Sequence, residues 1–170
     1  LDAALPAPAE INLHLPALLP DAYCADVHER LTLYKRLSDC GTLDELTALR
    51  EELVDRFGKL PVQADTLIDT HRLRILSQSL GITKIDAGDT QIVLQFSANT
   101  PVDPYRLIQI IQMHRHYKLS ASDRLTIQKK TETSAARVQA VRDALALLSS
   151  PQPEKTGVGA SEKSGTVSEK

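Results

Sequence analysis

The chain has 170 residues, 42% of them hydrophobic, and its 20 basic and 22 acidic side chains leave a formal net charge of −2. This composition suits one globular domain and argues against a broad nucleic-acid-binding surface. Two cysteines, Cys24 and Cys40, are too few for a disulfide framework, so we expect reduced core thiols. The longest apolar stretches are far below the roughly 20 residues of a membrane span, and we expect a cytoplasmic protein.

The first segment, residues 1–9, is rich in Ala and Pro and begins with Leu1, which we interpret as the linker remnant of a larger protein. Alternating apolar and polar residues predict a short strand over 11–15. The following segment, 23–38, has helical periodicity and predicts a first helix. Its predicted buried stripe consists of Val27, Leu31, Tyr34 and Leu37.

Two further helices have clear end signals. Thr42-Leu-Asp-Glu45 matches a capping box, so the second helix is expected to begin near Leu43 and to run to Gly58. Pro61 suits the first turn of a third helix that reaches about Leu80, and Gly81 suits a left-handed cap after it. The third helix is predicted to bury one stripe, formed by Ala64, Leu67, Ile68, His71, Ile75 and Leu76.

The second half of the chain mixes strand and helix patterns. Segments 82–85 and 91–96 alternate with period two around a turn that contains Gly88, which predicts an antiparallel hairpin. Asp103-Pro104 opens a fourth helix to about Met113, residues 123–128 read as a strand, and 133–148 as a last helix. Residues 149–170 lack core-forming side chains, so we expect a disordered tail.

These elements show no regular strand–helix–strand alternation. The sequence therefore predicts an α+β fold over residues 10–148, a single mixed domain of about five helices packed on a small, largely antiparallel sheet.

Motifs for catalysis or cofactor binding are not found. The seven glycines do not form a phosphate-binding loop, and His114-Arg-His116 lacks the further ligands that a zinc site requires. His71 lies in an apolar stripe and is interpreted as a buried, hydrogen-bonded side chain, and neither cysteine has a neighbouring base. We expect no catalytic, cofactor-binding or metal-binding residue in this chain.

The second helix carries a set of acids on one side. At about 100° per residue, the acids Asp44, Glu51, Glu52 and Asp55 lie opposite the apolar side chains. The helix dipole favours acids in the first turn, which accounts for Asp44 but not for Glu52 or Asp55 near the other end. On spacing alone, both a solvated helix surface and a binding face remain open.

Three segments resemble a known family: Leu19-Pro-Asp-Ala-Tyr23, Arg30-Leu-Thr-Leu-Tyr-Lys-Arg36, and Glu52-Leu-Val-Asp-Arg-Phe-Gly58 followed by Leu60-Pro61. In order and spacing they are similar to the C-terminal domain of bacterial transcription-repair coupling factors (the Mfd/TRCF family). The similarity extends over roughly residues 10–148.

This resemblance implies a function. Members of the family are ATP-driven DNA translocases that use ATP and Mg²⁺ in nucleotide-excision repair, and this domain is their non-catalytic regulatory part. It packs on the UvrB-like module of the same protein, masks the UvrA-binding surface and so competes with UvrA. In the family, the positions that correspond to Glu52 and Asp55 belong to this protein interface. The resemblance implies neither a membrane nor direct nucleic-acid binding.

Two other classes of function remain open. A nucleic-acid-binding accessory module of the same translocase would need the pairs Lys35-Arg36, Arg72-x-Arg74 and Lys129-Lys130 to converge in the fold. A small hydrolase would need a concave pocket with several ionisable groups.

Overall fold

The computed structural model describes residues 7–150. Residues 151–170 of the predicted tail and the first six residues of the predicted linker remnant lie outside the described part, whereas Ser149, assigned to the tail, is the last residue of the last helix. None of the described helices is long and apolar enough to cross a membrane. The elements in chain order are β1 Glu10–Asn12, α1 Val27–Asp39, α2 Leu43–Phe57, α3 Val62–Ser79, β2 Ile82–Ala87, β3 Gln91–Phe96, α4 Pro104–Met113, β4 Tyr117–Ala121, β5 Arg124–Gln128 and α5 Ser134–Ser149.

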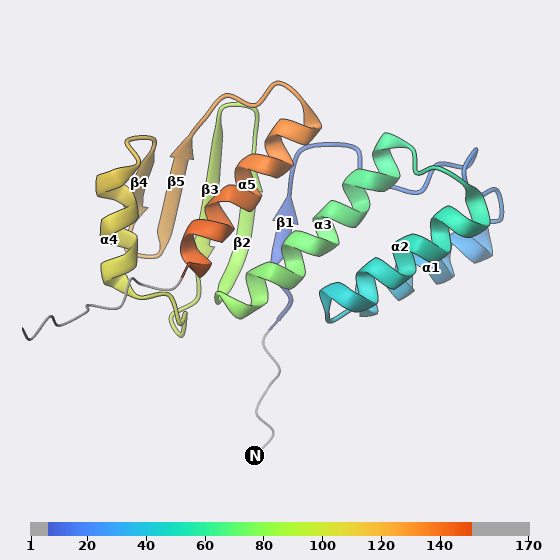
Figure 1. Ribbon diagram of the computed structural model, residues 1–170, viewed down its shortest axis with the longest axis horizontal. Helices are drawn as coiled ribbons and strands as arrows, with labels where there is room; N and C mark the ends of the chain where they lie inside the picture. Colours follow the sequence, from blue (N-terminus) through green and yellow to red (C-terminus); the bar gives the residue numbers. More distant parts are fainter. Residues whose placement is uncertain (1–6, 151–170) are drawn as a thin grey trace, which may run out of the picture.

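The five strands form one sheet in the order β1-β2-β3-β5-β4. Only the short β1 pairs in parallel, with β2, and the other three pairings are antiparallel. Helices α3 and α5 lie across one face of the sheet, α4 stands beside β4, and the α1–α2 pair lies beyond α3 at the opposite end (Figure 1). The predicted α+β fold with five helices and a largely antiparallel sheet is confirmed.

Two hydrophobic cores share helix α3. One core lies between the sheet and helices α3 and α5, and the other lies among α1, α2 and α3. The predicted stripe of α3 contributes Ala64, Leu67, Ile68 and Ile75 to the second core. Leu73, which the single-stripe prediction omits, is completely buried in the first core. A helix between two layers is buried on two sides, so one amphipathic stripe does not describe it.

The end signals read from the sequence are confirmed at several elements. Gly81 has φ of 64° between α3 and β2. The Asp103 carboxylate accepts the Tyr105 N–H at 2.9 Å at the start of α4, with Pro104 as its first residue. The antiparallel hairpin β2–β3 also forms as predicted.

Helix α1 differs from the prediction in its start and in its buried side. It begins at Val27, after Asp26 accepts the Glu29 N–H at 3.1 Å. Leu33 and Leu37 face the core, whereas Val27 and Leu31 of the predicted stripe are 60% and 62% exposed. The helix has apolar residues on two sides, and packing against α2 and α3 selects the Leu33 side.

Two strands also differ. The first strand ends at Asn12 rather than residue 15, because Asn12 accepts the His14 N–H at 3.0 Å and His14 has φ of 52°. Strand β4, which the sequence pattern leaves unassigned, forms the sheet edge beside β5. Four of its five residues are exposed, so it lacks the burial that makes a strand recognisable.

Candidate protein interface on helices α1 and α2

The capping box at the start of α2 sets which side of this helix faces outward. The Thr42 hydroxyl accepts the Glu45 N–H at 3.2 Å, and the Glu45 carboxylate accepts the Gly41 N–H at 3.2 Å. With this start, Leu46, Leu49 and Leu53 are buried, and the acids Asp44, Glu51 and Asp55 are exposed. The predicted acidic face therefore exists, with Glu52 at its border toward α1, where it meets Arg36.

Glu52 has partners inside the domain. Arg36 of α1 donates two hydrogen bonds to its carboxylate, at 2.5 and 2.9 Å, and Arg56 donates a third at 3.3 Å. Arg56 also pairs with Glu29, so four charges of alternating sign link α1 to α2. The Arg36 hydrogen bonds lower the pKa of Glu52 and raise that of Arg36. Because the side chains stay partly exposed, the pair stabilises the fold by no more than about 1 kcal/mol.

Asp55 lies one helical turn from Glu51 on the exposed side of α2. Within residues 7–150 its side chain makes neither an ion pair nor a hydrogen bond. An exposed carboxylate of this kind keeps its full capacity to accept hydrogen bonds from a partner. The two predicted interface residues thus differ: the domain itself engages Glu52, and it leaves Asp55 available.

The three segments that carry the family resemblance contact one another. The Tyr23 hydroxyl lies 3.0 Å from the Leu53 carbonyl and 2.8 Å from the Gly58 carbonyl, to which it donates. The Leu19 N–H donates to the Tyr34 hydroxyl oxygen at 2.7 Å, and Arg30 donates to the Cys24 carbonyl at 2.7 Å. These residues hold the α1–α2 pair together. Many residues of the three family segments therefore stabilise the fold rather than contact a partner.

Exposed apolar side chains on α1 add to the candidate surface. Val27 and Leu31, at positions i and i+4 of α1, present a small apolar patch to solvent. Helical periodicity places both in the core, and only the packing of α1 reveals them as surface residues. Single exposed apolar residues are ordinary, but two in helical register on one side of a helix suit a protein contact.

The basic pairs named for nucleic-acid binding do not converge. Arg36 pairs with Glu52, Arg72 pairs with Asp69, and Arg74 donates to the Leu37 and Cys40 carbonyls at 3.2 and 2.8 Å. Arg36 lies on α1, and Arg72 and Arg74 lie on α3. Lys129 and Lys130 follow β5, near the opposite end of the molecule.

The cysteines and His71, which could in principle take part in catalysis, are buried or partly buried within the domain. Cys24 and Cys40 are free and buried, as expected, and burial raises the pKa of the Cys40 thiol. His71 is partly buried and accepts from the Arg74 Nε at 3.3 Å; burial, with a smaller effect of Arg74, lowers its pKa to about 4. Residues 7–150 contain no cluster of three or more His, Cys, Asp or Glu that could hold a metal ion.

Comparison with known proteins assigns this arrangement to a family. The TRCF domain model matches residues 13–107, from the end of β1 into α4. The transcription-repair-coupling factor of Escherichia coli (strain K12) is 39% identical over 134 residues, 78% of this chain, and that of Haemophilus influenzae (strain ATCC 51907 / DSM 11121 / KW20 / Rd) is 38% identical over 138 residues, 81% of this chain. The chain spans 12% of the length of each of these relatives.

A solved structure agrees in fold. The crystal structure of the C-terminal domain of a transcription-repair coupling factor matches with a TM-score of 0.67 and 20% sequence identity, over 83% of this chain and 93% of the other. The family model covers more than half of the chain and includes the interlocked segments of α1 and α2. The chain therefore belongs to the transcription-repair-coupling factor family, in which it forms the TRCF domain.

Proposed function

We propose that this domain is a non-catalytic regulatory part of its parent protein and acts by docking. In this proposal it packs on the UvrB-like module of the same protein and masks the UvrA-binding surface until the parent factor engages its target in nucleotide-excision repair. The parent is then an ATP-dependent DNA translocase, and its ATP and Mg²⁺ bind outside this domain. Docking shifts the population toward a closed state, for which no catalytic group is required.

The observation that carries this proposal is the exposed acidic side of α2. Asp44, Glu51 and Asp55 line it, and the segment 21–57 has nine acidic and five basic side chains, a formal charge of −4. Such a surface suits a partner with exposed arginines, because carboxylate–guanidinium hydrogen bonds are both charged and directional. The exposed apolar side chains Val27 and Leu31 lie on the side of α1 away from Glu29 and Arg36, which reach α2, and are a separate exposed feature of the helix pair.

The two candidate interface residues have different expected roles. Glu52 already holds Arg36 and Arg56, so a partner's arginine would share or replace an internal pair. Asp55 has no pair within residues 7–150 to give up, so its substitution affects the proposed interface without breaking a described contact of the domain. Substitution of Glu52 would break contacts inside the domain as well as contacts with the partner. Substitution of Asp55 would test the contact with the partner by itself.

The test is a calorimetric titration of the isolated UvrB-like module with the 170-residue chain. Asp55→Arg is expected to weaken binding at least about tenfold, because repulsion replaces a charge-assisted contact. Glu132→Arg makes the same change of charge on an exposed side chain outside α1 and α2 and is expected to leave the affinity unchanged. Equal affinities of the wild-type and Asp55→Arg chains for the module would show that the acidic face of α2 is not part of the interface.

A competition assay tests the masking step separately. The wild-type chain is expected to prevent UvrA from binding the UvrB-like module, and the Asp55→Arg chain is expected to compete at least about tenfold more weakly. Simultaneous binding of UvrA and this chain to the module would contradict masking, even if docking itself occurred.

A further inference from the structure

The end of the molecule opposite α1 and α2 carries the reverse charge. Residues 114–130, which include β4 and β5, hold five basic side chains and one acidic one, a formal charge of +4 with neutral histidines. This segment and the acidic α1–α2 pair lie at opposite ends of the long axis (Figure 1). A chain of nearly zero net charge is thus strongly polarised, which overall composition conceals.

A pocket of about 660 Å³ opens in this basic end, between α5 and the residues that flank β4 and β5. This volume falls within the range of small-molecule sites. Its apolar wall consists of Ile127, Ala140 and Leu147. The ring of His114 packs beside that of Tyr117, with centroids 5.4 Å apart, and both rings line the pocket.

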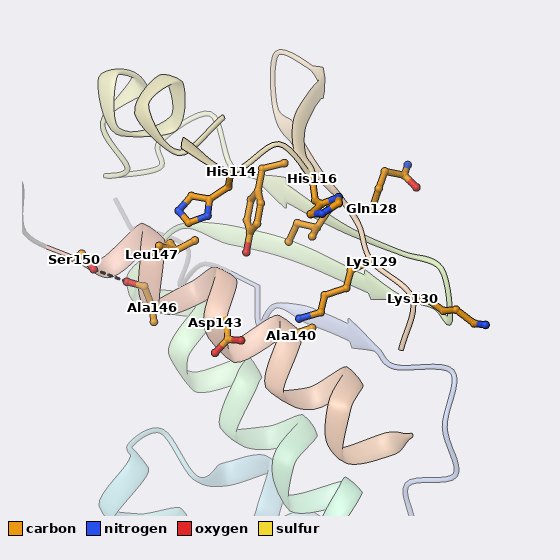
Figure 2. Close-up of a pocket in the computed structure, with 12 residues that line it drawn as sticks. His114, His116, Gln128, Lys129, Lys130, Ala140, Asp143, Ala146, Leu147 and Ser150 are labelled. Carbon is orange, nitrogen blue, oxygen red and sulfur yellow. Dashed lines mark hydrogen bonds between the residues drawn. The ribbon is translucent and has the colours of Figure 1, made fainter. Parts of the chain in front are cut away.

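Hydrogen-bond donors dominate the polar lining. Lys129 extends toward α5 over the pocket, whereas Lys130 points away from it (Figure 2) and pairs with Glu132 at 3.1 Å. Lys129 makes no ion pair with any residue of the range 7–150, and its backbone N–H is held by the Thr90 carbonyl at 3.1 Å. The backbone of Lys129 is therefore fixed beside the pocket, and its ammonium is available to an anion.

One acid lies on the opposite wall. Asp143 of α5 lines the pocket and accepts a hydrogen bond from Gln139 at 2.7 Å, which leaves acceptor capacity on its carboxylate. Burial, with a further contribution from Asp143, raises the pKa of Tyr117, so this hydroxyl remains protonated at neutral pH. The pocket thus combines a cation, aromatic rings, an apolar wall and one strong acceptor.

We propose that this pocket binds a nucleotide unit: its phosphate at Lys129, its base against the rings and apolar wall, and a ribose or base donor at Asp143. Phosphate needs the cation, and stacking needs the rings. A simple carboxylate offers neither a flat base nor a donor for Asp143, and an acidic peptide such as oligoglutamate offers no flat base. The same unit can come from a free mononucleotide or from a single strand of nucleic acid.

The test is an NMR titration of the 170-residue chain at low salt with deoxyadenosine monophosphate, deoxyadenosine, inorganic phosphate and an oligodeoxyadenylate of about twelve nucleotides. We expect the monophosphate to shift amide signals of residues 114–117 and 140–147 and to bind at least about tenfold more tightly than deoxyadenosine or phosphate alone. If the oligonucleotide binds at least about tenfold more tightly than the monophosphate, and its affinity falls steeply as salt is added, the natural ligand is a nucleic-acid strand. Equal binding per nucleotide identifies the free nucleotide.

Three substitutions locate the site. Lys129→Ala is expected to weaken binding about tenfold, and Lys59→Ala, an exposed lysine between α2 and α3, to leave it unchanged. Ala146→Trp is expected to fill the pocket and abolish binding, with Ala146→Ser as its control, because Ala146 is exposed and outside the core. The proposal is overturned if the shifts map elsewhere, if an oligoglutamate peptide competes as well as the monophosphate, or if none of the probes binds at roughly 10 mM.

Discussion

At the scale of single residues, Arg137 is a buried charged side chain that links remote segments of the chain. It is 7% exposed, and its partners among residues 7–150 are carbonyls and a hydroxyl rather than a carboxylate. Its guanidinium donates to the Leu13 carbonyl at 2.8 Å and to the Thr131 hydroxyl at 3.1 Å. It therefore joins the segment after β1, the segment after β5 and helix α5, which are remote in sequence.

Arg137→Met is expected to lower the free energy of unfolding by about 2–4 kcal/mol, because the Leu13 carbonyl and Thr131 lose their buried donor. Urea unfolding followed by circular dichroism measures this change. Arg142→Met on the exposed side of the same helix is the matched control, with an expected change within about 0.5 kcal/mol. Equal effects of the two substitutions would contradict a bridging role for Arg137.

His71 makes stability depend on pH. Its pKa is about 4 in the folded protein, below the ordinary value of 6.5, so the unfolded chain binds more protons between these values. Stability is therefore expected to fall as pH drops from 6.5 to 4, by up to about 2 kcal/mol after allowance for partial exposure. Urea titrations across this range measure the slope, and His71→Gln is expected to reduce it. An unchanged slope in His71→Gln would assign the effect to the carboxylates.

At the scale of elements, the joint between α3 and β2 depends on a glycine. Gly81 has φ of 64°, and a Cβ there would lie 2.7 Å from the Thr100 Cα. Thr100 is itself held close, because its hydroxyl donates to the Leu80 carbonyl at 2.6 Å. The connection can thus turn from helix to strand only while residue 81 lacks a side chain.

Gly81→Ala is expected to lower the melting temperature markedly, with a loss of about 2–4 kcal/mol from a positive φ and a backbone contact together. Gly41→Ala is the control, because a Cβ at position 41 would meet no neighbouring atom within 4 Å and the φ of Gly41 is not positive. Differential scanning calorimetry compares the two variants. Similar melting temperatures for the two variants would mean that the connection between α3 and β2 adjusts to a side chain at position 81, and would contradict the prediction.

At the scale of the whole molecule, α3 connects the two cores. Leu73 on one side of it is buried with the sheet, and Ile68 on another is buried with α1 and α2. The α1–α2 pair also carries the candidate interface. Because α3 belongs to both cores, we expect the two cores to unfold together. The stability of the sheet would then help to keep the α1–α2 surface folded for docking.

Leu53→Ala tests this coupling. Leu53 is completely buried in the core of α1 and α2, so the substitution is expected to cost about 2–5 kcal/mol. If the cores unfold together, the opening free energy of β3 amides, measured by native-state hydrogen exchange, falls by the same amount. Protection of β3 that stays unchanged would mean that the α1–α2 pair opens independently.

The sequence by itself determined the features that depend on neighbours along the chain. Thr42, Asp103 and Gly81 marked element ends correctly because caps and left-handed turns are satisfied within a few residues. The acidic side of α2 could be predicted because helical periodicity fixes which residues share a side. The three family segments could be recognised because their residues, order and spacing can be read along the chain.

Only the tertiary structure decided the features that depend on contacts between remote segments. It selected Leu33 rather than Leu31 as the buried side of α1, and it gave Glu52 an internal partner in Arg36 while leaving Asp55 exposed. It also formed the pocket near Lys129 and placed opposite charges at opposite ends. Periodicity shows which residues lie together on an element, but burial and ion pairing depend on which other element packs there.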